Sequence, residues 1–163
     1  MAETFYVTIK GQKQGAIKGD VTQKGREGTI PGLALSHDVV SPRDAASGLP
    51  TGKRMHKPLT ITTPWGSATP KLFTALFTNE NLTSVNMRFW RPAATGGTEI
   101  QFMTIDLTNA SISDIQSQVP DVRDPALAKY EEYHEISFTY QKIQITYTDG
   151  AITATDDWSV SNA

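Results

Sequence analysis

One stretch near the C-terminus, His134 to Tyr147 (HEISFTYQKIQITY), constrains the fold more than any other part of the chain. Apolar and polar residues alternate along it, which is the two-residue period of a strand with one buried face. The alternation changes phase at Gln141-Lys142, and in a regular strand this change would turn all later side chains to the opposite face. A β-bulge or a sharp bend absorbs such a change without ending the strand. We therefore predict one long strand that passes from one wall of a small barrel to another.

The alternative for this stretch is a pair of strands joined by a tight turn at Gln141-Lys142. Tight turns favour Gly, Pro, Asn or Asp, and this pair contains none of them. The single bent strand is therefore the better interpretation.

Weaker alternation predicts further strands, joined mostly by short antiparallel connections. We expect them over residues 5–9, 30–40, 54–62, 82–91, 98–112 and 152–160, with a weak strand near Ile17. The turn Ala94–Gly97 makes a hairpin of the two strands that flank it. A second change of phase is expected at Phe102-Met103, and the polar segment 116–129 is expected to be a loop with one helical turn.

One segment, residues 70–78, favours a helix that Asn79 ends. Thr69 is the expected N-cap, and Pro70 fits the first helical position because no N–H donor is needed there. We therefore predict an all-β fold, mainly an antiparallel β-barrel or two-sheet structure, with one flanking α-helix. A single domain is expected over residues 1–163. The side chains expected to be largely buried are Phe73, Leu76, Phe77, Ile136, Phe138 and Trp158.

Charge and composition give no support to several classes of partner. A net charge of −2 gives no electrostatic basis for binding nucleic acid or an acidic membrane. Arg88, Trp90 and Arg91 mix basic and aromatic character as single-strand nucleic-acid binders do, but we favour a strand face packed on a neighbour. The chain has no Cys, and we expect no membrane insertion and no secretory signal peptide.

The sequence offers no convincing catalytic, cofactor-binding or metal site. Gly48–Lys53 resembles a phosphate loop, but only three residues separate its glycines and Arg54 follows the lysine. The residues His37, His56 and His134 are isolated and lack metal-ligand spacing, so we interpret them as surface or hydrogen-bonded structural side chains. Asp156-Asp157 is interpreted as a pair of solvated charges, because strand neighbours point to opposite faces. We therefore expect a protein that is not an enzyme and needs no cofactor.

Several segments, in order along nearly the whole chain, carry a family resemblance. They are Lys18–Asp20 with Glu27–Ile30, Gly52–Thr62 followed by Thr69–Leu76, and Glu135–Ile143 with Asp157-Trp158. Together they resemble the Hcp (haemolysin-coregulated protein) family, the tube subunits of type VI secretion systems. The competing interpretations are a phage-like tail-tube subunit and a monomeric β-barrel module or enzyme for a small ligand.

The resemblance implies a β-barrel with a flanking helix that assembles as a homo-hexamer. Its rings would stack into a tube inside a contractile sheath, associate with spike proteins and hold small effector proteins in the lumen. It also implies assembly in the bacterial cytoplasm and then secretion to the extracellular space or a target cell, without a signal peptide.

Two places are expected to carry this function. Residues 41–52 form the longest Gly- and Pro-rich stretch, with almost no large apolar residue, and a loop of that length is usually functional. We expect the segment from Ser41 to Arg54 to lie at the ring face and contact the next ring or subunit through Leu49, Pro50, Gly52 and Arg54. Ser36 matches a small, lumen-facing position of the family, and alternation places it on the face opposite Leu35 and His37.

Overall fold

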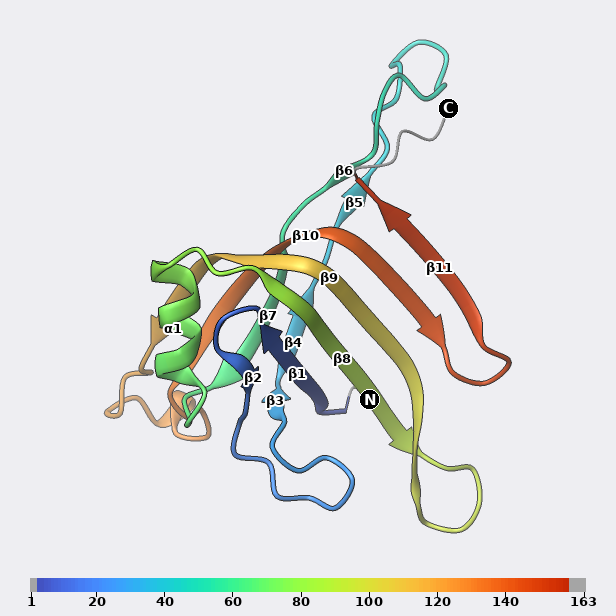
Figure 1. Cartoon of the computed structure of the whole chain (residues 1–163). Helices are drawn as coiled ribbons and strands as arrows, with labels where there is room; N and C mark the ends of the chain where they lie inside the picture. Colours follow the sequence, from blue (N-terminus) through green and yellow to red (C-terminus); the bar gives the residue numbers. More distant parts are fainter. Residues whose placement is uncertain (1–2, 159–163) are drawn as a thin grey trace.

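An antiparallel sheet rolled into a barrel forms the body of the protein, as a computed structural model that describes residues 3–158 shows (Figure 1). Its strands follow the order β2-β1-β8-β9-β10-β7-β4. Their bounds are Phe5–Gly11 (β1), Gly15–Ile17 (β2), Ala34–Ser36 (β4), Leu59–Pro64 (β7), Leu82–Pro92 (β8), Glu99–Gln118 (β9) and Tyr133–Tyr147 (β10). The prediction of an all-β fold with one flanking helix is confirmed.

Two short consecutive strands close the barrel. β3 (Ile30–Gly32) pairs with β1, and β4 pairs with β7 on the other side of the seam. Between them the Leu33 N–H donates to the Thr62 carbonyl at 2.8 Å. The predicted single strand over 30–40 is therefore wrong: the segment forms β3, β4 and β5 (Val39–Val40), because each pairs with a different partner.

The long bent strand is confirmed as β10. One edge pairs with β9 throughout, whereas the other pairs first with β7 and then, from Lys142, with β11 (Ile152–Asp157). Tyr140 and Ile143 are both buried, so the phase changes at Gln141. Opposite this point Asn109 has a φ of 49°, and its amide donates to Gln141 Oε1 at 2.9 Å. Both strands arch together over the barrel (Figure 1), and no turn interrupts either.

The second predicted change of phase is also present. Phe89 of β8 pairs with Met103, but Trp90 pairs with Gln101, so Phe102 is the extra residue of a β-bulge. β9 runs on to Gln118, six residues beyond the predicted end, and the expected helical turn in the next loop is the 3-10 helix η1 (Pro125–Leu127).

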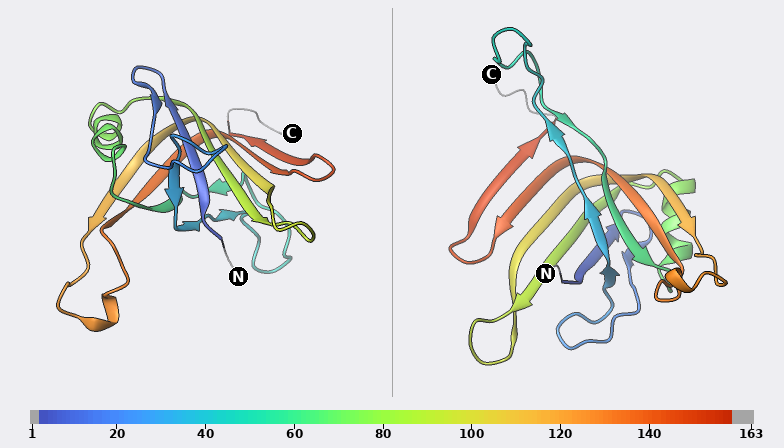
Figure 2. Two further views of the ribbon diagram at one scale, coloured as in Figure 1. Left: turned by 90° about the horizontal axis from the view of Figure 1, so that it is seen from below. Right: turned by 180° about the vertical axis from the view of Figure 1, so that it is seen from behind.

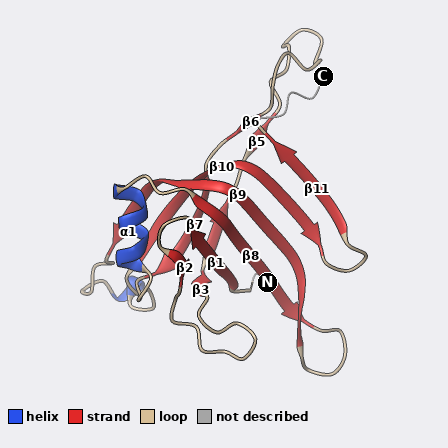
Figure 3. Ribbon diagram, in the orientation of Figure 1, coloured by secondary structure: helices blue, strands red, loops and turns tan. Residues whose placement is uncertain are grey.

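The helix α1 (Thr69–Phe77) flanks one side of the barrel (Figure 3). Its N-cap is Ala68 rather than the predicted Thr69. The Thr69 hydroxyl accepts from the Gly66 N–H at 3.0 Å and bonds to His134 Nε2 at 3.1 Å, so it ties the helix start to β10. Asn79, with a φ of 52°, follows the helix end as predicted. Within residues 3–158, no helix is long and apolar enough to cross a membrane.

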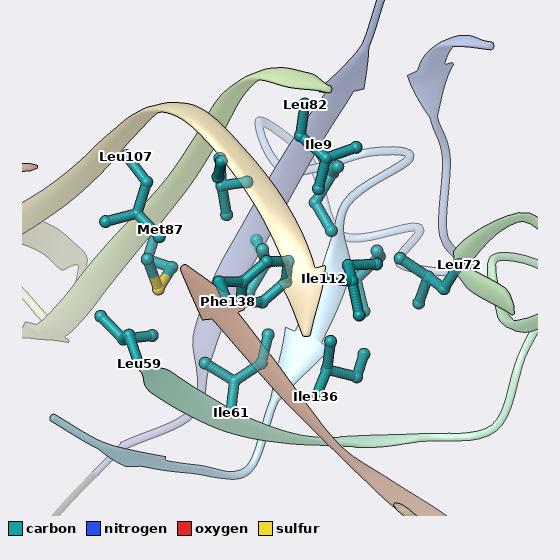
Figure 4. Close-up of a cluster of buried hydrophobic side chains, with 14 of the residues drawn as sticks. Ile9, Leu59, Ile61, Leu72, Leu82, Met87, Leu107, Ile112, Ile136 and Phe138 are labelled. Atoms are coloured by element: carbon teal, nitrogen blue, oxygen red, sulfur yellow. The ribbon is translucent and has the colours of Figure 1, made fainter. Parts of the chain in front are cut away.

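The core lies inside the barrel and under α1 (Figure 4). Ile136 and Phe138 are fully buried, as predicted. Leu72 and Ala75 form the buried face of the helix, whereas Phe73 and Leu76 are only partly covered. Burial of Phe77 and Trp158 was predicted wrongly, since their exposed fractions are 78% and 43%. The Phe77 ring packs beside Phe73 at 5.8 Å between centroids, on the solvent side of the helix.

Truncating Phe138 to Ala is expected to lower the free energy of unfolding by about 3–5 kcal/mol, because the ring is fully buried in the barrel. The matched control Phe77→Ala should change it by no more than about 0.5 kcal/mol in a single subunit. Urea unfolding at one fixed protein concentration measures both. Equal losses in the two variants would contradict this placement of the core.

Candidate functional site

The extended hairpin, defined here as residues 39–56, projects beyond one end of the barrel (Figures 1 and 2). Its stem pairs β5 with β6 (Met55–His56), so the predicted strand over 54–62 is split into β6 and β7. An isolated bridge joins Arg43 to Pro50. The Asp44 N–H also donates to the Leu49 carbonyl at 2.9 Å. The predicted long loop is therefore a hydrogen-bonded arm.

The residues predicted to make ring contacts lie at different heights on this arm. Leu49, Pro50 and Gly52 are exposed near the tip, and Leu49 has an exposed fraction of 65%. Arg54 instead lies at the root of the arm. Its Nε and Nη2 donate to the two oxygens of the Asp156 carboxylate, at 2.9 and 2.7 Å. The structure therefore brings three of the four together and gives the fourth an anchoring contact.

A cluster of polar side chains holds the root of the hairpin. The Tyr140 hydroxyl lies 2.8 Å from both His37 Nε2 and His56 Nδ1. His56 Nε2 lies 2.5 Å from the Asp156 carboxylate, which also accepts the two bonds from Arg54. The interpretation of these histidines as hydrogen-bonded structural side chains is confirmed, although His37 and His56 are not isolated but share the Tyr140 hydroxyl. The interpretation of Asp156 as a solvated charge is wrong, because its carboxylate is bonded to Arg54 and His56. Sequence reasoning missed Tyr140 in this role, because its place in the alternation indicated only burial.

Hydrogen-bond counting assigns the protons in this cluster. A tyrosine hydroxyl has one proton to donate, so one histidine must accept it while the other donates to the oxygen. The Asp156 carboxylate can only accept, which places a proton on His56 Nε2. With neutral rings, His56 Nδ1 then accepts from Tyr140, and His37 Nε2–H donates to the Tyr140 oxygen. The chain of donors runs in one direction, from His37 to Asp156.

The surroundings reinforce these protonation states. Burial, and then the neighbouring His56, lower the pKa of His37. Burial, and then the charge of Asp156, raise the pKa of Tyr140 to about 12. The hydrogen bonds from Arg54 lower the pKa of Asp156. Neutral His37 and Tyr140 beside an ionised Asp156 are therefore the forms that the folded root favours near neutral pH.

A second surface, the outer wall, is formed by the side chains of β4, β7 and β10 that point away from the core. Its members are Ala34, Ser36, Thr60, Thr62, Glu135 and Ser137. Thr60 and Ser137 share a hydrogen bond of 2.8 Å between their hydroxyl oxygens. Ser36 is exposed here beside Thr60, whereas Leu35 packs against the core. Apart from Glu135, the side chains of this wall are small, and all but Ala34 are polar; they surround a shallow hollow.

On the basic and aromatic face of β8, one side of the Trp90 ring is covered from within the chain. The guanidinium of Arg26 lies 3.9 Å from the centre of the Trp90 ring, and it forms an ion pair of 2.6 Å with Glu99. Arg26 itself has an exposed fraction of 6%. This arrangement agrees with a packed strand face rather than a nucleic-acid surface. Nothing in the periodicity of the loop that carries Arg26 indicated that this side chain would be buried.

The fold and these two surfaces define a class: small antiparallel barrels with a projecting arm and a polar outer wall. The sequence model of the family described as "Type VI secretion system effector, Hcp" matches residues 6–147. The chain belongs to this Hcp family. Membership makes it a secreted, structural tube subunit of a type VI secretion system, and it favours this function over a phage tail-tube subunit or a monomeric ligand-binding module.

Individual relatives agree over nearly the full length. The chain is 36% identical to the "Major exported protein" of Pseudomonas aeruginosa strain PAO1, with 97% of this chain and 96% of that protein covered. It resembles the crystal structure of an Hcp protein with a TM-score of 0.90 at 29% identity, covering 98% of this chain and 100% of that one. For a mutant of Hcp1 from Escherichia coli EAEC 042 the TM-score is 0.84 at 27% identity, covering 96% and 99%. For Hcp3 from Pseudomonas aeruginosa it is 0.78 at 29%, covering 95% and 97%.

The lowered pKa of His37 predicts loss of stability in mild acid. Unfolded histidine takes up a proton near pH 6.5, but folded His37 does so only at lower pH, so its contribution is present above pH 6.5 and is lost as the pH falls through the folded pKa. His37→Gln keeps a hydrogen-bonding group near Tyr140 but cannot titrate. The free energy of unfolding of this variant should depend less steeply on pH between 7 and about 5. Urea titrations at several pH values measure it, and an unchanged slope would contradict the assignment.

Proposed function

We propose that six copies of the chain close into a ring, and that rings stack into the inner tube of a type VI secretion machine. Family membership across residues 6–147 is the observation that carries this proposal. In it, the tube assembles in the bacterial cytoplasm within a contractile sheath, meets spike proteins and is expelled into the extracellular space or a target cell. No step requires a catalytic group or a cofactor.

The two surfaces of the site receive different roles in this proposal. The outer wall with Ser36 lines the lumen, where small polar side chains leave room and stay wet beside a small effector protein. The extended hairpin lies at the ring face and touches the next ring or subunit. Its exposed Leu49 and Pro50 support this role, because they lie far from the barrel core on an arm that the root cluster holds in place.

The first expected outcome concerns assembly. Light scattering should find six times the 17.8 kDa mass of one chain, and electron micrographs should show rings or tubes. Replacing Leu49-Pro50 with Gly-Gly should leave six-fold rings intact and reduce their stacking, since only the tip of the hairpin changes. A purely monomeric protein at micromolar concentrations would refute the ring, and unchanged tube formation by the Gly-Gly variant would refute the role of the tip.

The second expected outcome concerns the lumen. Ser36→Trp places a large side chain on the outer wall, so it should reduce retention and export of a small effector without unfolding the subunit or opening the ring. Ser36→Thr is the matched control, because it keeps a small hydroxyl side chain. Co-purification of effector with the ring measures retention. Normal retention by the Ser36→Trp ring would show that this face does not meet the cargo.

A further inference from the structure

An apolar pocket of about 440 Å³ opens on the surface of the barrel. The parts of β1, β3, β8 and β9 around it lie at the end of the barrel away from the extended hairpin (Figure 1). The apolar lining of the pocket comes from the start of β1, the turn between β3 and β4, strand β4 itself, the end of β8 and the start of β9. These residues are Phe5, Leu33, Leu35, Phe89, Trp90 and Phe102. Leu33 has an exposed fraction of 57% although it lines an apolar site. A hollow of this kind is typical of a docking surface.

We propose that this pocket receives the tip of the extended hairpin from a second copy of the chain in the next ring, with Leu49 as the side chain that enters it. The inference rests on the proposed function and adds the receiving surface for the ring contact. Hairpin and pocket lie at opposite ends of one subunit, so their union is head-to-tail. A head-to-tail contact that does not close on itself repeats without limit, as a tube requires.

The hairpin tip is already ordered for insertion. The Gly48 N–H donates to the Asp44 carbonyl at 2.8 Å, and the Asp44 carboxylate accepts from the Ser47 N–H at 2.9 Å. These bonds hold the turn that presents Leu49. A tip with its conformation fixed beforehand loses little freedom on docking, which favours binding. A single leucine contributes little binding free energy to each contact. Because a ring presents six such contacts at once, their combined affinity for the next ring is much higher.

Charges on the two surfaces are complementary. The tip carries Arg43 and Asp44 in sequence, both exposed. The pocket carries Glu3 and Arg91, which are also exposed, and the Arg91 guanidinium lies 4.9 Å from the centre of the Phe102 ring. Docking that brings Arg43 next to Glu3, and Asp44 next to Arg91, therefore places opposite charges beside each other. Such pairs set the orientation of a contact more than its strength.

Because the natural chain has no Cys, engineered cysteines give a direct test. The double variant Leu33→Cys, Leu49→Cys is oxidised, or treated with a short bismaleimide, both as purified full-length protein and in cells that produce it. We expect a ladder of covalent oligomers that continues beyond six chains, because each link joins one ring to the next. The control pair Phe77→Cys, Leu49→Cys, with its second cysteine on the exposed helix face, should give no such ladder.

The other outcomes overturn the inference in distinguishable ways. A ladder that stops at six places the contact within one ring. Tubes in micrographs without any cross-link leave the proposed function standing and exclude this pocket as the receiver. A wild-type protein that forms no rings refutes the proposed function itself, and with it the contact between rings.

A charge exchange provides an independent measurement. Glu3→Lys should raise several-fold the protein concentration at which tubes form, while six-fold rings persist. Adding Arg43→Glu to the same chain should restore assembly, because the opposed charges are then reversed together. Failure of the second change to restore tube formation would exclude the pairing of Arg43 with Glu3.

Discussion

The bend of β10 at Gln141 is the constraint on which the rest of the structure depends. Before it the strand pairs with β7 in the barrel wall, and after it the same edge pairs with β11. The left-handed backbone of Asn109 lets β9 turn together with it. A straight β10 would turn Ile143 and the residues after it out of the core, and Asp156 of β11 would lie away from Tyr140. One local change of direction therefore places both the barrel wall and the root of the hairpin.

The root cluster shows how a short stem can support a long arm. The stem pairs only Val39 with His56 and Val40 with Met55, and a two-stranded ribbon of that length is marginal in water. His56 and Arg54 of the hairpin also form directional bonds to Tyr140 of β10 and Asp156 of β11. His37, which precedes the hairpin, bonds to the same Tyr140 hydroxyl. These bonds lie at the root of the hairpin, where it leaves the barrel. The direction of the hairpin relative to the barrel is therefore fixed by side chains rather than by strand pairing.

The parts of the fold that depend on alternation could be predicted from the sequence. β10, its change of phase and the bulge at Phe102 are visible in the order of apolar residues. The position of the helix in the chain was predicted, but its buried face was not. Phe77 was expected in the core because it is apolar, whereas the smaller Ala75 is the residue that is buried there. The root cluster was not predictable, since His37, Tyr140 and Asp156 are brought together only by pairing between distant strands. The exposure of Ser36 followed from alternation, whereas the anchoring of Arg54 depended on β11.

The place of β10 in the chain also bears on how the protein is made. β1 cannot pair with β8 until β8 has been made, because Phe5 lies opposite Phe89. Likewise β7 cannot pair with β10 until β10 has been made, because Leu59 lies opposite Phe138. The strand that completes the core, β10, is therefore made after its partners β7 and β9. Pairings this distant along the chain are slow to form, and until then the apolar strand faces stay open to other molecules. Chains in which β10 is not yet paired are therefore expected to associate wrongly more readily than the finished barrel.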